Sequence, residues 1–167
     1  MAQRIFTGRI ALHHGCATLD SMGKLMAQAR INHMEVTVAR GTLATMMPAL
    51  KAFYCETLGF QSAQFDAFPG CHIFLTSEDP GRYFIYVAEH ERPMVVGGDD
   101  HLGFHMEDRA AVDRVLTACR ALARVDARME IRDLDDLNLE QTLTHAFYFR
   151  YLLPIWFDIQ FVEFKPS

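Results

Sequence analysis

The sequence predicts an α+β protein built from two βαβββ units whose curled, mixed sheets surround a shared cavity. The first reason is a near-repeat. An alternating strand pattern with a histidine occurs at His33 and again at His101, and an amphipathic helix pattern follows each one. The second reason is that short strand patterns follow each of the two helices. Units of this size bury their apolar faces only against a neighbour, so the two units are expected to pack together.

The repeat divides the chain into an N-terminal arm, 1–30, a first unit, 31–98, and a second unit, 99–167. The arm contains a short helix pattern around 20–30. We expect the arm either to strap the core of its own subunit or to reach a second subunit. Open curled sheets leave edges that need cover, and this predicts a homodimer.

The first unit begins with a strand at 31–38, in which His33 and Glu35 share one face. A helix is expected to begin near Pro48, which is tolerated in a first turn, and to end at Gly59. Its buried side is formed by Leu50, Phe53, Tyr54 and Leu58. Strands are then expected at 60–65, 71–76 and 83–88, separated by Pro-Gly turns.

The second unit follows a glycine-containing linker at 96–100 and begins with a strand at 101–106. Asp108 is a predicted N-cap of the next helix. The buried side of that helix carries Val112, Val115, Leu116, Cys119 and Leu122. The remaining strands are expected at 128–132, 144–150 and 157–164. The acidic segment 133–140 is interpreted as a solvated loop, with a lid as the alternative.

Composition narrows the classes of partner. The chain has 167 residues, half of them hydrophobic, and 13 are phenylalanine, which is enough for a real core. Its 16 basic and 21 acidic side chains give a net charge of −5 without a basic cluster, which argues against nucleic acid. It contains neither a bilayer-length apolar run nor a secretory signal pattern. The four cysteines show no C-x-x-C spacing, as expected for free thiols in the cytoplasm.

The equivalent positions of His33 and His101 predict a metal site, because stacking the two units would bring both rings toward one cleft. The alternative is that both are satisfied core or cleft histidines. His90 and His145 are possible proton carriers, and we interpret both as surface or strand-end residues.

Four segments resemble the vicinal oxygen chelate superfamily, which includes glyoxalase I, extradiol dioxygenases and bleomycin-resistance proteins. They are H-M-E-V-T-V at 33–38, A-F-Y-C-E-T-L-G-F at 52–60, H-L-G-F-H-M-E-D at 101–108 and F-D-I-Q-F-V-E-F at 157–164. The resemblance covers 31–164, and it identifies the fold better than the reaction.

The resemblance implies metal ligands on the first strand of each unit and on the last strand of the second, namely His33, His101 and position 160. Family members carry a glutamate at that last position, whereas this chain has Gln160. A neutral amide is a weaker ligand for Fe(II) or Mn(II) than a carboxylate. Asp158 shares the face of Gln160 and is expected to reach inward only if the loop at 151–156 shifts register. Glyoxalase-type members add a fourth ligand, for which Glu89 is the nearest carboxylate here.

Tyr148 lies in F-Y-F-R and resembles the tyrosine that extradiol enzymes direct at the substrate hydroxyl. The alternative is an aromatic residue of the barrel wall. His105 shares a strand face with His101 and is a candidate base, with a solvated strand end as the alternative.

These features favour a metal-dependent enzyme that resembles extradiol ring-cleavage dioxygenases and acts on a small aromatic or oxygen-chelating substrate. Two other functions stay open. The first is a lyase or isomerase of the glyoxalase kind. The second is a metal-free protein that binds a small molecule, as bleomycin-resistance proteins do, and Gln160 favours it.

Overall fold

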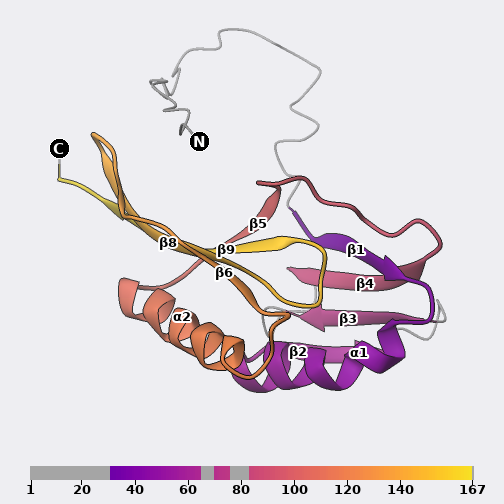
Figure 1. Ribbon diagram of the computed structural model, residues 1–167. Coiled ribbons are helices and arrows are strands. Elements are labelled where there is room, and N and C mark those ends of the chain that lie inside the picture. Colours follow the sequence, from indigo (N-terminus) through magenta and orange to yellow (C-terminus); the bar gives the residue numbers. More distant parts are fainter. Residues whose placement is uncertain (1–30, 65–69, 76–82, 167) are drawn as a thin grey trace, which may run out of the picture. The chain divides into compact units, whose positions relative to one another are not determined.

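The computed structural model describes residues 31–64, 70–75 and 83–166, so the arm and its expected helix at 20–30 lie outside the described residues. The first unit forms a four-stranded sheet in the order β1-β4-β3-β2 (Figure 1). The pair β1 and β4 is parallel, and the other two pairs are antiparallel. The strands are β1 (His33–Ala39), β2 (Gln61–Gln64), β3 (Cys71–Leu75) and β4 (Phe84–His90).

The second unit forms a sheet in the order β5-β9-β8-β6, with the short strand β7 paired to β8. Here β5 and β9 are parallel and the remaining pairs are antiparallel. The strands are β5 (His101–His105), β6 (Glu130–Asp133), β7 (Leu137–Asn138), β8 (Thr142–Arg150) and β9 (Trp156–Phe164). The predicted fold of two βαβββ units with curled mixed sheets is confirmed, and the sheets stay open (Figure 1).

The first helix begins earlier than predicted. It runs as α1 (Leu43–Leu50) and continues as the π-helix η1 (Lys51–Thr57), so Pro48 lies inside the helix. Its first turn is stabilised from another strand, because the Leu43 N–H donates to Glu89 Oε1 at 2.7 Å. Proline lacks an N–H and crowds the preceding turn, which fits the wider turns after it. The predicted stop is confirmed by Gly59 at φ 78°.

The second helix, α2 (Arg109–Ala123), confirms the predicted cap. Asp108 is in an extended conformation, and its carboxylate accepts from the Ala111 N–H at 2.6 Å. Val112 and Cys119 are fully buried, as the helical periodicity requires. Among the described helices, none is both long enough and apolar enough to cross a bilayer.

The helix sides of the two units share one hydrophobic core. The ring of Phe53 in η1 lies 5.5 Å from that of Phe149 in β8, and the ring of Tyr54 lies 5.6 Å from that of Phe157 in β9. The hydroxyl of Tyr54 also donates to the carbonyl of Tyr151 at 2.9 Å. The residues of η1 therefore join the two sheets, and unfolding of one unit should expose the apolar face of the other.

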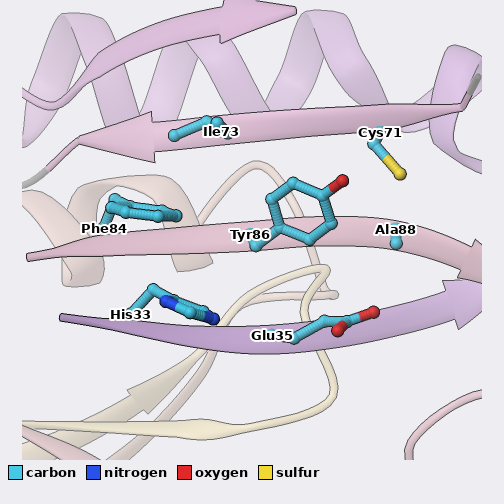
Figure 2. Close-up of a pocket in the computed structure, with 7 residues that line it drawn as sticks. All are labelled: His33, Glu35, Cys71, Ile73, Phe84, Tyr86 and Ala88. Atoms are coloured by element: carbon cyan, nitrogen blue, oxygen red, sulfur yellow. The ribbon is translucent and has the colours of Figure 1, made fainter. Parts of the chain in front are cut away.

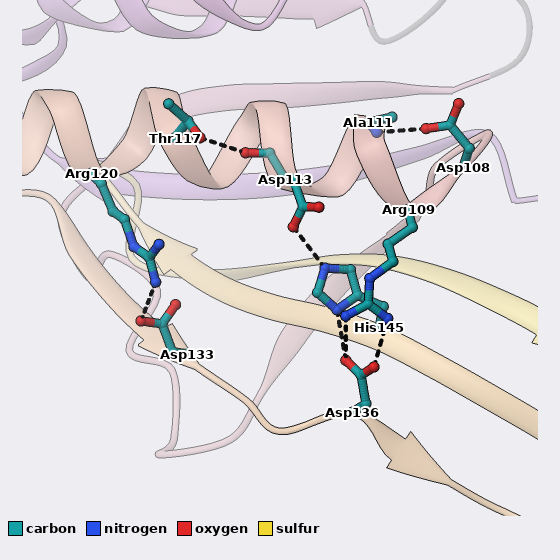
Figure 3. Close-up of polar contacts among 9 residues, drawn as sticks. All are labelled: Asp108, Arg109, Ala111, Asp113, Thr117, Arg120, Asp133, Asp136 and His145. Carbon is teal, nitrogen blue, oxygen red and sulfur yellow. Dashed lines mark hydrogen bonds and ion pairs between the residues drawn. The ribbon is translucent and has the colours of Figure 1, made fainter.

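The acidic segment is more ordered than the predicted loop, because part of it forms β7 and part is held by ion pairs (Figure 3). The ring of His145 in β8 lies between Asp136, 2.8 Å from Nδ1, and Asp113 of α2, 2.9 Å from Nε2. Arg109 of α2 donates to the same Asp136 carboxylate at 2.6 Å and, together with His145, lowers its pKa. His145 is therefore a structural link between α2, β8 and this segment.

Leu152 lies in the turn before β9 and is the one non-glycine residue of the described chain with positive φ, 61°. The Leu153 N–H donates to the Tyr151 carbonyl at 2.7 Å, so Leu152 is the centre of a tight three-residue turn.

Substituting Leu152 by glycine should change the free energy of unfolding by no more than about 1 kcal/mol. The relief of a left-handed leucine, about 1–2 kcal/mol, offsets the lost burial and the chain entropy of glycine, about 0.5–1 kcal/mol. The neighbouring Leu153→Gly is the matched control, because Leu153 is buried and has ordinary φ. That variant should lose at least about 3 kcal/mol in urea unfolding. Equal losses in the two variants would show that Leu152 carries no strain.

Candidate functional site

Three side chains meet on the face of the second sheet that points away from the helices. Asp158 of β9 lies between its register partners, Gly103 of β5 and Tyr148 of β8. The Nε2 atom of His101 lies 3.7 Å from Asp158 Oδ2. The His101 ring also stacks on Tyr148, with 5.0 Å between ring centroids and 22° between planes. The structure thus brings together two sequence-predicted residues and one carboxylate.

The carboxylate of Asp158 is buried, with 6% of the residue exposed. Its Oδ1 atom has no hydrogen-bond partner among the described residues. Burial raises the pKa of Asp158, and the nearby His101 opposes part of that rise. A buried acceptor without a donor costs about 1–3 kcal/mol, and more when it is charged. A cation seated beside this carboxylate and His101 would remove that cost.

Both predicted histidine ligands have their Nδ1 atom engaged. In His101, Nδ1 lies 2.8 Å from the Asp99 carbonyl, which can only accept, so Nδ1 carries a proton. In the neutral form of this ring, Nε2 presents its lone pair on the side of Asp158, 3.7 Å from Oδ2. In His33, Nδ1 lies 2.9 Å from Asn32 Oδ1, and the ring stacks on Phe84. Metal-binding histidines usually have one ring nitrogen held in this way.

His33 lies in a pocket of about 440 Å³ on the face of the first sheet opposite the helices (Figure 2). Its lining among the described residues comes from β1, β3 and β4 and consists of His33, Glu35, Cys71, Ile73, Phe84, Tyr86 and Ala88. Burial, with a smaller effect of Cys71, raises the pKa of Tyr86 to about 12, so its phenol stays protonated at neutral pH. Within residues 31–64, 70–75 and 83–166, no three His, Cys, Asp or Glu side chains are grouped as metal ligands. A site that joins His33 to His101 therefore stays a prediction.

Gln160 lies two residues after Asp158 in β9, and His105 lies two residues after Gly103 in β5. Gln160 and His105 are register partners. The Gln160 Nε2 atom is 3.4 Å from the position that a Cβ atom would occupy at Gly103. The amide therefore borders the space beside Asp158. The His105 ring instead lies 6.1 Å from that of Phe161, and it lines a separate pocket between η1 and the start of α2. The structure does not bring His105 to His101.

Glu89, the nearest carboxylate for a fourth metal ligand, instead accepts hydrogen bonds at the start of α1. Backbone N–H groups at Gly41 and Leu43 lower the pKa of its carboxyl, because they donate to it at the start of α1. His90 is bonded locally, with Nδ1 2.9 Å from the Arg92 carbonyl. Neither residue is part of the cluster around His101.

Asp158 is the site residue that sequence reasoning undervalued. The alternation of β9 placed it on the correct face, but we expected a register shift before it could point inward. The structure needs no such shift, because the parallel pairing of β5 with β9 already sets Gly103 against Asp158. The absent side chain at Gly103 leaves room there, since its Cβ position is 3.9 Å from Asp158 Oδ2.

Comparison with solved structures shows the fold. A glyoxalase family protein from Bacillus anthracis matches with a TM-score of 0.53 and 14% identity, over 80% of this chain and 94% of that one. The fosfomycin resistance protein FosX from Listeria monocytogenes matches with a TM-score of 0.55 and 14% identity, over 78% and 90%. Lactoylglutathione lyase from Agrobacterium tumefaciens matches with a TM-score of 0.52 and 16% identity, over 81% and 95%.

No protein-family model matches the sequence, and no curated protein matches it either. The chain has the vicinal oxygen chelate fold that its sequence motifs predicted. At these identities the matches carry the fold alone. The function must therefore be argued from the residues of the site.

Proposed function

We propose that this protein is a metal-dependent enzyme that acts on a small, oxygen-chelating substrate. The observation that carries the proposal is the buried carboxylate of Asp158, whose Oδ1 has no partner among the described residues and whose Oδ2 lies 3.7 Å from Nε2 of His101. A carboxylate and a neutral imidazole are a donor pair that suits Fe(II) or Mn(II). A divalent ion held there would supply Lewis-acid polarisation of the substrate oxygens. One FosX structure similar to this chain was determined with Mn(II).

The other residues of the cluster would orient the substrate. Burial raises the pKa of Tyr148, helped by the charge of Asp158, so its phenol is protonated at neutral pH. A protonated phenol can donate a hydrogen bond to a substrate oxygen that gains negative charge. Gln160 offers an amide beside the carboxylate, where family members have the acidic ligand. In this proposal Asp158 supplies the charge that position 160 lacks.

We also propose that two subunits build each site. The described residues that line the pocket of His33 all belong to the first sheet, whereas His101 and Asp158 belong to the second sheet. The helix-covered faces of both sheets pack into one shared core. The opposite faces, which carry His33 and His101, are therefore available for contact with a second copy of the chain. A homodimer would place His33 of one subunit opposite His101 of its partner.

Mixing two inactive variants tests this arrangement. His33→Ala and His101→Ala should each lose Mn²⁺ binding in isothermal titration. After the two are unfolded together and refolded, about a quarter of the wild-type sites should return, since half the dimers are mixed and each has one intact site. Refolding each variant alone is the control. A wild-type protein that binds no Mn²⁺, Fe²⁺ or Zn²⁺ would refute the metal function. Intact metal binding without recovery in the mixture would refute only the sharing between subunits.

A metal-free binding protein is the second candidate, and the neutral Gln160 and the His33 pocket favour it. Aromatic and aliphatic side chains, Phe84, Tyr86 and Ile73, line much of that pocket. In this case small aromatic compounds should bind equally well before and after treatment with a chelator. The ring-cleavage reaction predicted from the sequence is one possible chemistry of the metal-dependent class. Product analysis with a catechol and dioxygen tests it against lyase activity.

A further inference from the structure

The orientation of the His101 ring depends on a linker that is flexible by composition. Gly97 and Gly98 directly precede Asp99, whose carbonyl accepts the Nδ1 proton of His101. Glycine permits many backbone conformations, so this carbonyl needs contacts from elsewhere to hold its direction. One such contact is local, since the Gly97 N–H donates to Asp100 Oδ2 at 3.0 Å.

Arg132 of β6 reaches the same linker from another strand. Its Nη1 atom donates to the Gly98 carbonyl at 2.8 Å and lies 3.3 Å from Asp99 Oδ1. The Asp99 side chain is 99% exposed, so that ion pair adds little. The contact with the Gly98 carbonyl is the important one, because it fixes the peptide plane directly before Asp99, one peptide unit from the carbonyl that accepts from His101.

The guanidinium of Arg132 is itself held in place. Its central carbon lies 4.0 Å from the ring centroid of Trp156, which is buried and is the register partner of His101. A planar cation stacked on a buried aromatic ring keeps little freedom. Arg150 lies over the same ring at 4.7 Å, but its guanidinium is paired with Glu130.

The stack between His101 and Tyr148 does not replace this contact. Stacking fixes the plane of the imidazole. A half-turn of the ring about its bond to Cβ keeps that plane, but it exchanges the ring nitrogens with the carbons opposite them. The hydrogen bond to the Asp99 carbonyl, at 2.8 Å, sets the direction of the ring and favours the proton on Nδ1, against the more distant Asp158 carboxylate 3.7 Å from Nε2.

We propose that Arg132 is a positioning residue for His101. Through the Gly98 and Asp99 backbone it holds the imidazole in the tautomer with a protonated Nδ1 and directs the Nε2 lone pair at Asp158. The inference rests on the proposed function only in taking this lone pair to bind a metal ion. Lysine cannot replace Arg132, because an ammonium lacks the planar fork that stacks on Trp156 while donating to Gly98.

The test compares Arg132→Lys with Arg150→Lys, which changes the other arginine over Trp156. Nitrogen NMR of the His101 ring, in protein freed of metal, reports the tautomer directly. We expect a mainly Nδ1-protonated ring in wild type and Arg150→Lys, and a clear gain of the Nε2-protonated form in Arg132→Lys. Mn²⁺ affinity should fall about tenfold or more in Arg132→Lys alone. Should Arg132→Lys fail to fold, Arg132→Gln provides the same comparison.

The outcomes separate the two proposals. If wild type binds no metal but Arg132→Lys shifts the tautomer, the positioning role stands and the metal function fails. If wild type binds Mn²⁺ and the tautomer of Arg132→Lys equals that of wild type, Arg132 does not position His101 and the inference is overturned. An equal shift in Arg150→Lys would also overturn it, because the effect would then arise from Trp156.

Discussion

Asp158→Asn should lower Mn²⁺ affinity by about a hundredfold or more, because loss of a charged ligand should exceed the roughly 10–100-fold effect of outer partners. The same change should stabilise the metal-free protein by about 1 kcal/mol at pH 7, because it removes a buried carboxylate that lacks a donor. Opposite effects on metal binding and on stability are the signature of a residue placed for a ligand. A residue placed for the fold would not show them.

The pH dependence gives an independent check on Asp158. Burial raises its pKa in the folded protein above that in the unfolded chain. Between these two pKa values the folded state holds the proton and the unfolded state does not, so wild-type stability should fall as the pH rises through that interval. Asp158→Asn should lack this fall.

Urea unfolding at several pH values, with EDTA and with Mn²⁺, measures both effects of Asp158→Asn. Glu163→Gln is the control, because Glu163 is an exposed carboxylate on the same strand. A variant that loses stability at neutral pH and binds Mn²⁺ like wild type would contradict the assignment of Asp158.

Strand alternation, helical spacing and the helix cap predicted the fold well, because each depends only on residues that are close together in the sequence. Alternation identified the strands at His33 and His101, and helical spacing placed Val112 and Cys119 in the core. The Asp108 cap acts on an N–H only three residues away. The first helix shows the limit of this approach. Its start at Leu43 depends on Glu89, which is 46 residues away in the sequence and belongs to a different strand.

The site could be predicted only in part, because its geometry depends on contacts between residues that are far apart in the sequence. Alternation placed Asp158 and Gln160 on one face of the last strand, but strand register decides which of them approaches His101. His145 looked like a strand-end residue, yet it is held by carboxylates 9 and 32 residues away. The distribution of apolar residues likewise gave no sign that η1 would join the two sheets.

Tyr54→Ala should cost about 3–5 kcal/mol of unfolding free energy, the range for large aromatic residues removed from a core. Only 1% of Tyr54 is exposed, and its ring contacts Phe74 of the first sheet and Phe157 of the second. Tyr54→Phe should lose only about 0.5–1 kcal/mol, because the Tyr151 carbonyl keeps the Leu153 N–H as a donor.

The single tryptophan makes this prediction informative about cooperativity. Trp156 lies in β9, so its fluorescence follows the second unit, whereas Tyr54 belongs to the first. If the two units share one core, Tyr54→Ala should lower the urea midpoint of tryptophan fluorescence and of circular dichroism equally. Tyr83→Ala, at a residue of the first unit that is 49% exposed, should stay within about 0.5 kcal/mol of wild type. A fluorescence midpoint that stays unchanged in Tyr54→Ala would show that the second unit folds on its own, and the site on its sheet would then not depend on η1.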